Sequence, residues 1–476
     1  MNWEPVIGLE IHVHLKTRTK MFCRCELEYF APENSRTCPV CLAHPGTLPV
    51  SNRRAIEMTI LLGHALGCRV VEHAIFHRKH YFYPDLPKGY QISQYDVPLC
   101  AGGRLGDVRL HRIHLEEDAA KLTHVGESGR IHGSSASVVD FNRGGTPLAE
   151  IVSEPDLRSA EQAREWLTLL RVTLRQLGVS DVNMEEGSLR CDANVSIRPA
   201  GTDALGTKTE LKNMNSFRFV MQGINAELER QTALLDAGDP VVQETLHFDP
   251  ATGRLTPLRS KEEAHDYRYF PEPDLVPLAP TEAMIQAAHD AIPELPAQRA
   301  ERYERDWALP AETARLFAFR PELGDYFEAA ATARGAETEA ALVASWVKDE
   351  LLSRLPAEAD PAGSNVSPPA LATLAGLVRD GAVTRGAGRQ VLDRLVEAGG
   401  DPAEIVEREG LGALGDGDEL AAIVAHVIEA NPDVAERVRG GNPKAIGALV
   451  GPVMRETKGR ADGGEVNRLL REQLGV

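Results

Sequence analysis

Polar and apolar residues alternate strictly from Leu9 to Leu15, and this alternation constrains the fold more than any other feature of the chain. A period of two predicts a β-strand with Leu9 on one face and Glu10, His12 and His14 on the other. Most such strands are simply half-buried, with the polar face in water. Here the polar residues are a carboxylate and two imidazoles, and Glu10 and His12 can both reach one divalent cation. We therefore expect a sheet with an incomplete metal site on its polar face, where His14 is a supporting or structural residue.

The size of the chain predicts a globular protein of several domains. It has 476 residues, of which 43% are hydrophobic, enough for roughly two to four domains. No run approaches the roughly 18 apolar residues of a membrane span, and the first residues lack the basic and apolar regions of a signal peptide. We expect a cytoplasmic protein without a membrane anchor.

The charge distribution is uneven. A net charge of −18 argues against a protein that coats nucleic acid, because nonspecific affinity for phosphates comes from clustered Lys and Arg. The C-terminal part is different, with eight Lys or Arg against four acids between Arg437 and Glu472. A local basic surface is therefore expected there.

Four of the seven cysteines are grouped as Cys23-x-Cys25 and, twelve residues later, Cys38-x-x-Cys41. An odd number of cysteines without an export signal disfavours a disulfide framework. Paired thiols around a short loop suit tetrahedral zinc, and four thiolates leave no open position for a substrate, so the metal would be structural. The alternative is four reduced thiols that happen to cluster. The other three cysteines are interpreted as ordinary buried thiols.

The pattern of elements predicts an α+β region followed by helices. Up to about residue 290, short alternating runs mix with a few helical stretches. A helix is expected after the capping box of Ser159 and Gln162, with Gly178 as its stop, and a second over Phe217–Leu235. Frequent prolines at 271–296 predict an extended connector. Helical periodicity follows, and Gly- and Asp-rich segments at 400–418 suggest a junction before a final helical unit.

Several acidic residues stand in unusual places. Glu150 lies between apolar residues of a predicted strand, and three adjacent carboxylates occupy 116–118. Charges are rarely buried without a partner or a metal. A salt bridge to an arginine explains Glu150 alone equally well. Convergence of several carboxylates with His12 would instead fit a magnesium site that orients nucleotide phosphates.

Three further segments are candidates for ligand contact. Residues 77–91 interleave aromatic residues with Lys, Arg and His, which suits base stacking and phosphate neutralisation, although the aromatic rings could equally belong to the core. Residues 184–196 and 209–216 place acids and amides at alternating positions of predicted strands. These side chains would form either the floor of a polar cavity or a solvated face of the sheet. The sequence contains no Walker motif and no Gly-x-Ser-x-Gly motif, which excludes a P-loop and a serine hydrolase elbow.

Six long segments carry a resemblance to a known family: Val6–His12, Tyr81–Gln94, His114–Ala119, Gly145–Asp156, Met184–Asn194 and Asp266–Asp274. They strongly resemble the B subunit of the glutamyl/aspartyl-tRNA amidotransferase, and the resemblance continues through the tail. It implies a cradle-shaped catalytic domain like that of glutamine synthetase, with an antiparallel sheet, over residues 1–295. It also implies a helical domain over 296–405 and a small helical tail domain that binds tRNA over 406–476.

The resemblance also implies the reaction. The family transfers the γ-phosphate of ATP to the side-chain carboxylate of Glu-tRNA(Gln) or Asp-tRNA(Asn), and ammonia then displaces the phosphate to form the amide. Ammonia comes from glutamine that the glutaminase, or A subunit, hydrolyses, and the small C subunit makes the enzyme a heterotrimer. A nondiscriminating aminoacyl-tRNA synthetase is a further candidate partner. The expected activity is an ATP-dependent, glutamine-hydrolysing carbon–nitrogen ligase.

Carried over by position, the resemblance implies roles for particular residues. Glu10, His12, Glu117 and Glu150 would be the magnesium ligands or their immediate shell. Lys79, as a catalytic residue, and Lys88 would contact ATP phosphates or the tRNA end. Asp192 and Glu210 are weaker candidates for the cofactor site. The cysteines at 23, 25, 38 and 41 resemble the zinc knuckle of some members. The candidates for tRNA binding are Arg439, Lys444, Arg455, Lys458 and Arg460.

The chain departs from the family pattern in places that spare the expected metal site. Ala120 stands where the family usually has Gly, Pro452 replaces the usual Gln, and Arg455 replaces Lys. Two other classes of protein would fit parts of the pattern. A noncatalytic zinc-knuckle RNA-binding scaffold would fit the cysteines and the basic tail, but it would avoid the acidic cluster. A ligase for a free amino acid would not need the basic tail.

Overall fold

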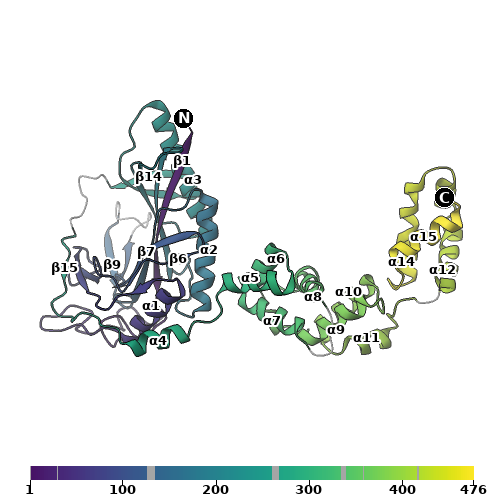
Figure 1. The fold of residues 1–476 in the computed structure, drawn as a ribbon, viewed down its shortest axis with the longest axis horizontal. Helices are drawn as coiled ribbons and strands as arrows, with labels where there is room; N and C mark the ends of the chain where they lie inside the picture. Colours follow the sequence, from purple (N-terminus) through teal and green to yellow (C-terminus); the bar gives the residue numbers. More distant parts are fainter. Residues whose placement is uncertain are drawn as a thin grey trace. The chain divides into compact units, whose positions relative to one another are not determined.

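The computed structural model describes residues 2–28, 30–125, 134–259, 267–333, 339–357, 359–414 and 417–476. The chain divides into two compact units, Met1–Leu295 and Pro296–Val476 (Figure 1). The first is mixed α/β around a large sheet, and the second is helical. Asp266 of the motif Asp266–Asp274 lies outside the described residues.

A ten-stranded sheet forms the centre of the first unit. Its order is β14-β13-β12-β11-β1-β10-β7-β5-β2, with β6 paired to β7 beside this path. The strands are β1 (Trp3–His14), β2 (Arg69–Val70), β5 (Cys100–Ala101), β6 (Arg104–Leu105), β7 (Val108–Glu117), β10 (Pro147–Ser153), β11 (Leu189–Pro199), β12 (Thr209–Lys212), β13 (Thr245–Asp249) and β14 (Arg254–Arg259). The expected strand is thus confirmed over Leu9–His14 as part of β1, in the middle of the sheet.

Helices cover the apolar face of this sheet. They are α1 (Arg53–Ala65), α2 (Ala160–Gln176) and α3 (Phe217–Ala237), and α4 (Glu282–Asp290) packs on α1. Leu9 and Ile11 of β1 are at most 1% exposed and share one core with Trp166 and Leu170 of α2. Because successive side chains of a strand point to opposite faces, Glu10 and His12 face away from this core. The α+β organisation therefore presents the polar side of β1 to the candidate site.

Two short sheets lie in the same unit. One has the order β15-β3-β4, with β3 (His77–His80), β4 (Tyr90–Ser93) and β15 (Phe270–Pro271), and the other is the hairpin of β8 (Lys121–Val125) and β9 (Ala136–Asp140). The basic and aromatic segment 77–91 thus forms β3, the start of β4 and the loop between them. Arg78 forms a bidentate ion pair with the buried Glu272 and ties the chain after residue 270 to β3.

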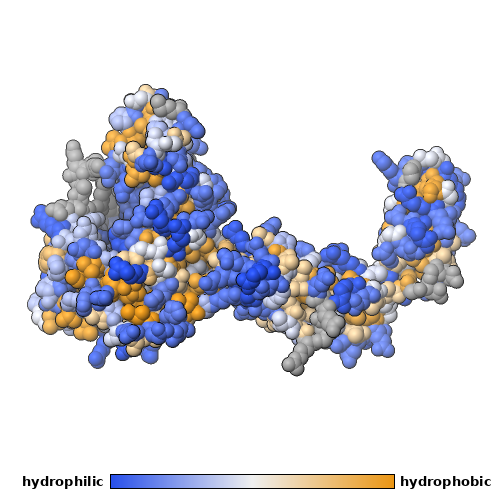
Figure 2. Space-filling model, viewed as in Figure 1, coloured by the Kyte–Doolittle hydropathy of each residue, from blue (hydrophilic) through white to orange (hydrophobic). Residues whose placement is uncertain are grey.

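The prediction of an extended connector over residues 271–296 is wrong in part. Residues Glu282–Asp290 form α4, which begins at the side-chain cap of Thr281 and packs on α1. The prolines flank this helix instead of interrupting it, so they do not prevent its formation. Apolar residues gather on the face of the first unit shown in Figure 2, around the positions of α1 and α4.

The second unit consists of helices around two hydrophobic clusters. The α-helices are α5 (Pro296–Trp307), α6 (Ala311–Ala318), α7 (Pro321–Ala331), α8 (Ala340–Ser345), α9 (Pro368–Arg379), α10 (Arg385–Ala398), α11 (Pro402–Glu409), α12 (Gly417–Ala430), α13 (Pro432–Arg439), α14 (Gly447–Glu456) and α15 (Gly463–Leu474). The shorter helical segments are η2 (Trp346–Leu351), η3 (Leu352–Arg354), η4 (Pro361–Gly363) and η5 (Pro443–Ile446). In the part of the chain that the structure describes, no helix has the length and apolar character needed to cross a membrane.

Candidate functional site

The register of three neighbouring strands assembles the polar side chains. His12 of β1 lies opposite Glu150 of β10, and Glu150 lies opposite His114 of β7. Residues directly opposite each other in an antiparallel pair project to the same face of the sheet. One polar row therefore crosses β1, β10 and β7, on the side away from the helices.

His12, Glu116 and Glu150 form a group that can hold a metal ion. Their ligand atoms lie within 4.8 Å of one another, and His12 Nε2 is 3.4 Å from Glu150 Oε2 and 3.7 Å from Glu116 Oε1. Adjacent ligands of octahedral magnesium stand about 3 Å apart, so a small adjustment of these side chains suffices. The two glutamates are 2% and 7% exposed, and buried carboxylates this close together need a positive partner.

Histidine and hydroxyl groups fix the two carboxylates. His114 Nε2 lies 3.2 Å from Glu150 Oε2 and 3.8 Å from Glu116 Oε2, and the Ser93 hydroxyl donates to Glu116 Oε2 at 3.0 Å. Burial opposes a charge on His114, but the carboxylates of Glu150 and Glu116 outweigh it and raise the pKa of His114 to about 9. His114 therefore supplies positive charge to the group.

Lys79 of β3 reaches the same group. Burial disfavours its charge, yet the carboxylates of Glu116 and Glu150 hold the pKa of Lys79 above its ordinary value. Its ammonium also lies 4.9 Å from the centre of the Tyr267 ring, a cation–π distance. The structure thus brings the predicted Lys79, His12 and Glu150 together.

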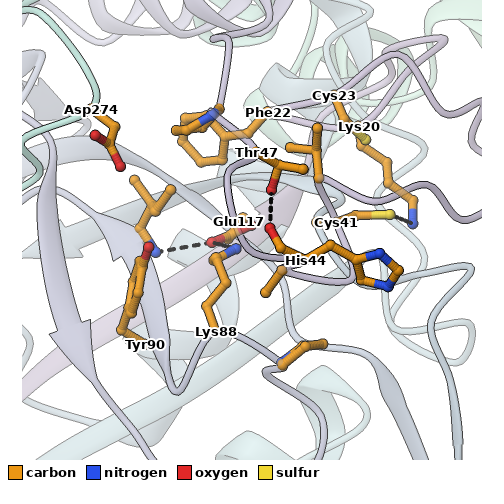
Figure 3. A pocket seen from close by; sticks show the side chains of 16 residues that line it. Lys20, Phe22, Cys23, Cys41, His44, Thr47, Lys88, Tyr90, Glu117 and Asp274 are labelled. Atoms are coloured by element: carbon orange, nitrogen blue, oxygen red, sulfur yellow. Dashed lines mark hydrogen bonds and ion pairs between the residues drawn. The ribbon is translucent and has the colours of Figure 1, made fainter.

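Glu117 and Lys88 lie together, but not in this group. Glu117 pairs with Lys88 and accepts a hydrogen bond from the backbone N–H of Ile92 at 3.0 Å. Both side chains line a cavity of about 260 Å³, and Lys20, Cys41, Tyr90 and Asp274 also line it (Figure 3). The adjacent Glu116 takes the position beside His12 that the resemblance implied for Glu117.

A second polar group extends along the same face over β1, β11 and β12. Lys212 Nζ lies 3.0 Å from Asp192 Oδ2 and 2.9 Å from Glu210 Oε1. Glu10 lies opposite Asp192 in the register and accepts a hydrogen bond from Asn194 at 2.9 Å. The three acidic candidates Glu10, Asp192 and Glu210 thus share one group, with Lys212 between the last two.

Sequence reasoning missed Glu116, His114, Lys212 and Asn194. A signal for the first two was present, because His114 and Glu116 alternate with the apolar Ile113 and Leu115 as polar residues of a half-buried strand do. Lys212 and Asn194 lie inside the two segments singled out as a polar floor. His14, interpreted as a supporting or structural residue, is 3% exposed, and its Nε2 lies 2.6 Å from Asp118 Oδ2.

The four grouped cysteines fit a zinc ion. The Sγ atoms of Cys23, Cys25, Cys38 and Cys41 lie within 4.8 Å of one another, and those of Cys38 and Cys41 are 3.9 Å apart. Tetrahedral zinc with bonds of about 2.3 Å separates its sulfur ligands by about 3.8 Å. Cys68, Cys100 and Cys191 are free and buried, as expected.

The basic candidates of the tail lie in or beside its helices. Arg439 ends α13, Lys444 lies in η5, and Arg455 lies in the last turn of α14. Lys458 and Arg460 follow α14, and Arg460 is partly buried near Glu419 at 3.7 Å. The other four are exposed, as contacts with an RNA backbone require.

The sheet with its buried acidic group, the cysteine quartet and the helical unit together define a multidomain protein with a candidate metal-dependent catalytic domain. The chain matches the family described as GatB/GatE catalytic domain over residues 5–286 and that described as GatB domain over 325–474. The chain therefore belongs to the GatB family, which comprises the B subunits of the tRNA-dependent amidotransferases, as the resemblance indicated.

Individual relatives match this chain over almost their whole length. The chain is 48% identical to the B subunit of the aspartyl/glutamyl-tRNA(Asn/Gln) amidotransferase from Anaeromyxobacter sp. (strain K), over 100% of this chain and 99% of the relative. It is 45% identical to the subunit of the same name from Persephonella marina, over 100% of both chains. These matches do not support the alternative of a noncatalytic RNA-binding scaffold.

Proposed function

We propose that this chain activates and amidates the side-chain carboxylate of Glu-tRNA(Gln) or Asp-tRNA(Asn). A carboxylate oxygen attacks the γ-phosphorus of ATP, which gives an acyl phosphate and ADP. Ammonia then attacks the acyl carbon, phosphate leaves, and the amide forms after loss of a proton. The observation that carries the proposal is the buried group of His12, Glu116 and Glu150, because phosphoryl transfer requires a held cation.

In this proposal His12, Glu116 and Glu150 hold magnesium, and Glu10, two residues before His12 on the same face, is a further ligand candidate. The bound ion would neutralise the oxygens of the transferring phosphoryl group. Lys79 supplies a second positive charge beside these carboxylates, and His114 keeps Glu150 in place. Asp192, Glu210 and Lys212 form the adjoining part of the ATP site. Glu117 and Lys88 act from the neighbouring cavity.

The arrangement of the chain supports a division of labour. We propose that residues 1–295 form a catalytic cradle like that of glutamine synthetase, with a zinc knuckle at 23–41. Residues 296–405 form the helical domain and 406–476 the tail, which binds tRNA through Arg439, Lys444, Arg455, Lys458 and Arg460. The exposed basic residues of the tail support this last assignment.

We also propose a heterotrimer with the A and C subunits of the amidotransferase, in which the glutaminase supplies ammonia. The apolar surface over the first unit in Figure 2 is consistent with contact to another protein. A nondiscriminating aminoacyl-tRNA synthetase is a further candidate partner. Because the substrates are misacylated tRNAs, we infer that the complex works in the cytoplasm.

The test is amide formation by the heterotrimer with both misacylated tRNAs. We expect Gln-tRNA(Gln) or Asn-tRNA(Asn) to form only with ATP and magnesium, with one ADP released for each amide. The double variant Glu10→Ala, Glu150→Ala should lose this activity. The matched control is Glu154→Gln. Glu154 lies just after β10, and its carboxylate pairs with His111. Unimpaired turnover by the double variant would overturn the metal assignment.

A further inference from the structure

Lys20 is a buried lysine beside the cysteine quartet. It is 1% exposed, and its Nζ donates to the carbonyl oxygen of Phe141 at 2.8 Å and lies 3.6 Å from Cys41 Sγ (Figure 3). Among the described residues, no carboxylate forms an ion pair with it. A buried ammonium without a negative partner is strongly unfavourable. Of the two groups that the ammonium contacts, the Phe141 carbonyl and the Cys41 sulfur, only Cys41 can carry a negative charge.

The charge of the quartet depends on its state. Four protonated thiols are neutral and would leave Lys20 uncompensated. Four thiolates around one Zn²⁺ carry a net charge of −2, which a buried ammonium at hydrogen-bond distance from one sulfur partly balances. The environment of Lys20 therefore favours the metal-loaded form, and this argument is independent of the cysteine spacing.

Lys20 also joins the quartet to the sheet. Its backbone N–H donates to the carbonyl of Cys25 at 3.0 Å, while its side chain binds Phe141. Phe141 begins the short segment that leads to β10, the strand of Glu150, and the N–H of Met21 binds Gly145 in the same segment at 2.7 Å. The side chain thus contacts both the metal centre and the chain that leads into the acidic group.

We propose that Lys20 is a positioning residue of the cysteine metal centre, whose ammonium stabilises Cys41 as a metal-bound thiolate and fixes the knuckle to the segment before β10. The proposal rests on the zinc assignment and not on the amidation reaction. Its test needs neither ATP nor tRNA, so its failure and that of the proposed function are distinguishable.

The experiment measures zinc affinity and the rate of zinc release to a chromogenic chelator in the heterotrimer. Lys20→Met should weaken zinc binding by about 10- to 100-fold, the usual effect of removing a group that supports a metal ligand. Lys20→Arg keeps the positive charge and should recover most of this loss. The matched control is Lys16→Met, an exposed lysine of the same segment that pairs with Asp181. It should behave as the unaltered chain does.

A Lys20→Met chain that binds and releases zinc like the unaltered chain would overturn the proposal, as would an unaltered chain that binds no zinc. If Lys20→Met does not fold, the absorption spectrum of the Lys20→Arg chain loaded with Co²⁺ tests the proposal instead. The thiolate-to-cobalt absorption band should shift, because a different donor then faces Cys41. An unshifted band would contradict a charged hydrogen bond to this sulfur.

Discussion

Two adjacent glutamates at the end of β7 have different surroundings. Glu116 lies with His12 and Glu150, whereas Glu117 pairs with Lys88. The pleat explains this separation, because successive side chains of a strand leave on opposite faces. Which of them would be the metal ligand of the proposed function is therefore a question about single residues, and substitution can answer it.

We expect Glu116→Gln to raise the magnesium concentration for half-maximal amide formation by about 10-fold or more and to lower kcat by roughly 100-fold. The neutral amide keeps the size of the side chain but removes the charge that binds the cation. Glu117→Gln should change the magnesium requirement much less, because Glu117 lies outside the group of His12. Magnesium titrations of amide formation with both variants check this. The reverse order of effects would assign the metal to Glu117.

The side chains of single residues were only partly predictable from the sequence. Glu10, His12 and Glu150 stood out because a charge among apolar neighbours is visible locally. His114 and Lys212 did not, because their importance depends on which strands become neighbours. The register that places His114 opposite Glu150 is a property of the sheet.

At the scale of elements, the helical segment η2 carries a buried glutamate. Glu350 is 4% exposed and pairs with Arg385 and Arg389 of α10 and with Arg354. The hydrogen bonds and charges of Arg389 and Arg385 outweigh burial and lower the pKa of Glu350 to about 2. The ion pairs therefore connect η2 to α10 only while Glu350 is ionised.

The pH dependence follows from the direction of this shift. The pKa of Glu350 is lower in the folded chain than the roughly 4.3 of an unfolded one. Its contribution to stability is therefore complete above about pH 5 and is lost as the pH falls toward 2. Glu350→Gln should lower the free energy of unfolding of the helical unit by about 2 kcal/mol at pH 7. Between pH 5 and 2, the free energy of unfolding of this variant should fall less steeply than that of the unaltered chain.

Denaturant unfolding of the full chain at several pH values, followed by a probe in the helical unit, measures this effect. The control is Glu397→Gln, an exposed partner of Arg394, which should change stability by less than about 0.5 kcal/mol. If the Glu350→Gln chain is less stable than the unaltered chain by the same amount at pH 7 and at pH 2, the contribution of Glu350 to stability is not electrostatic.

Helices were the most predictable elements. Ser159 caps α2 by accepting from the N–H of Gln162, and Gly178 follows the helix with φ of 66°, as the sequence indicated. The side-chain oxygen of Gln162 accepts a hydrogen bond from the N–H of Arg158, and not from the N–H of Ser159 as in a capping box. Caps and periodicity act within a few residues, so they can be read locally. The helix α4 was missed because flanking prolines were interpreted as an extended segment.

At the scale of the whole molecule, the acidic chain ends in a segment, Arg437 to Glu472, in which Lys and Arg outnumber the acids by eight to four. In the proposed function, the tail contacts phosphates, which makes binding dependent on salt, whereas the group of His12, Glu116 and Glu150 acts at the reacting end of the substrate. Changes in the tail should therefore affect tRNA binding and leave the chemistry intact.

We expect the double variant Arg455→Gln, Lys458→Gln to raise the KM for misacylated tRNA. It should also reduce the slope of the binding constant against salt concentration, on logarithmic scales, by the amount that roughly two phosphate contacts contribute. Its kcat and magnesium requirement should stay close to those of the unaltered chain. The matched control is Glu456→Gln, between the two substituted residues, which should not weaken binding. An unchanged KM and salt slope would contradict tRNA binding by these residues.

The sequence by itself determined the family, the α+β unit followed by helices, the central strand and the cysteine quartet. These depend on local periodicity, short spacings and long motifs, which are all present in the linear chain. Only the tertiary structure decided that Glu116, and not Glu117, joins His12 and Glu150, and that Lys20 faces Cys41. Such contacts join residues far apart in the chain, and their geometry depends on strand register and on the packing that buries each charge beside its partner.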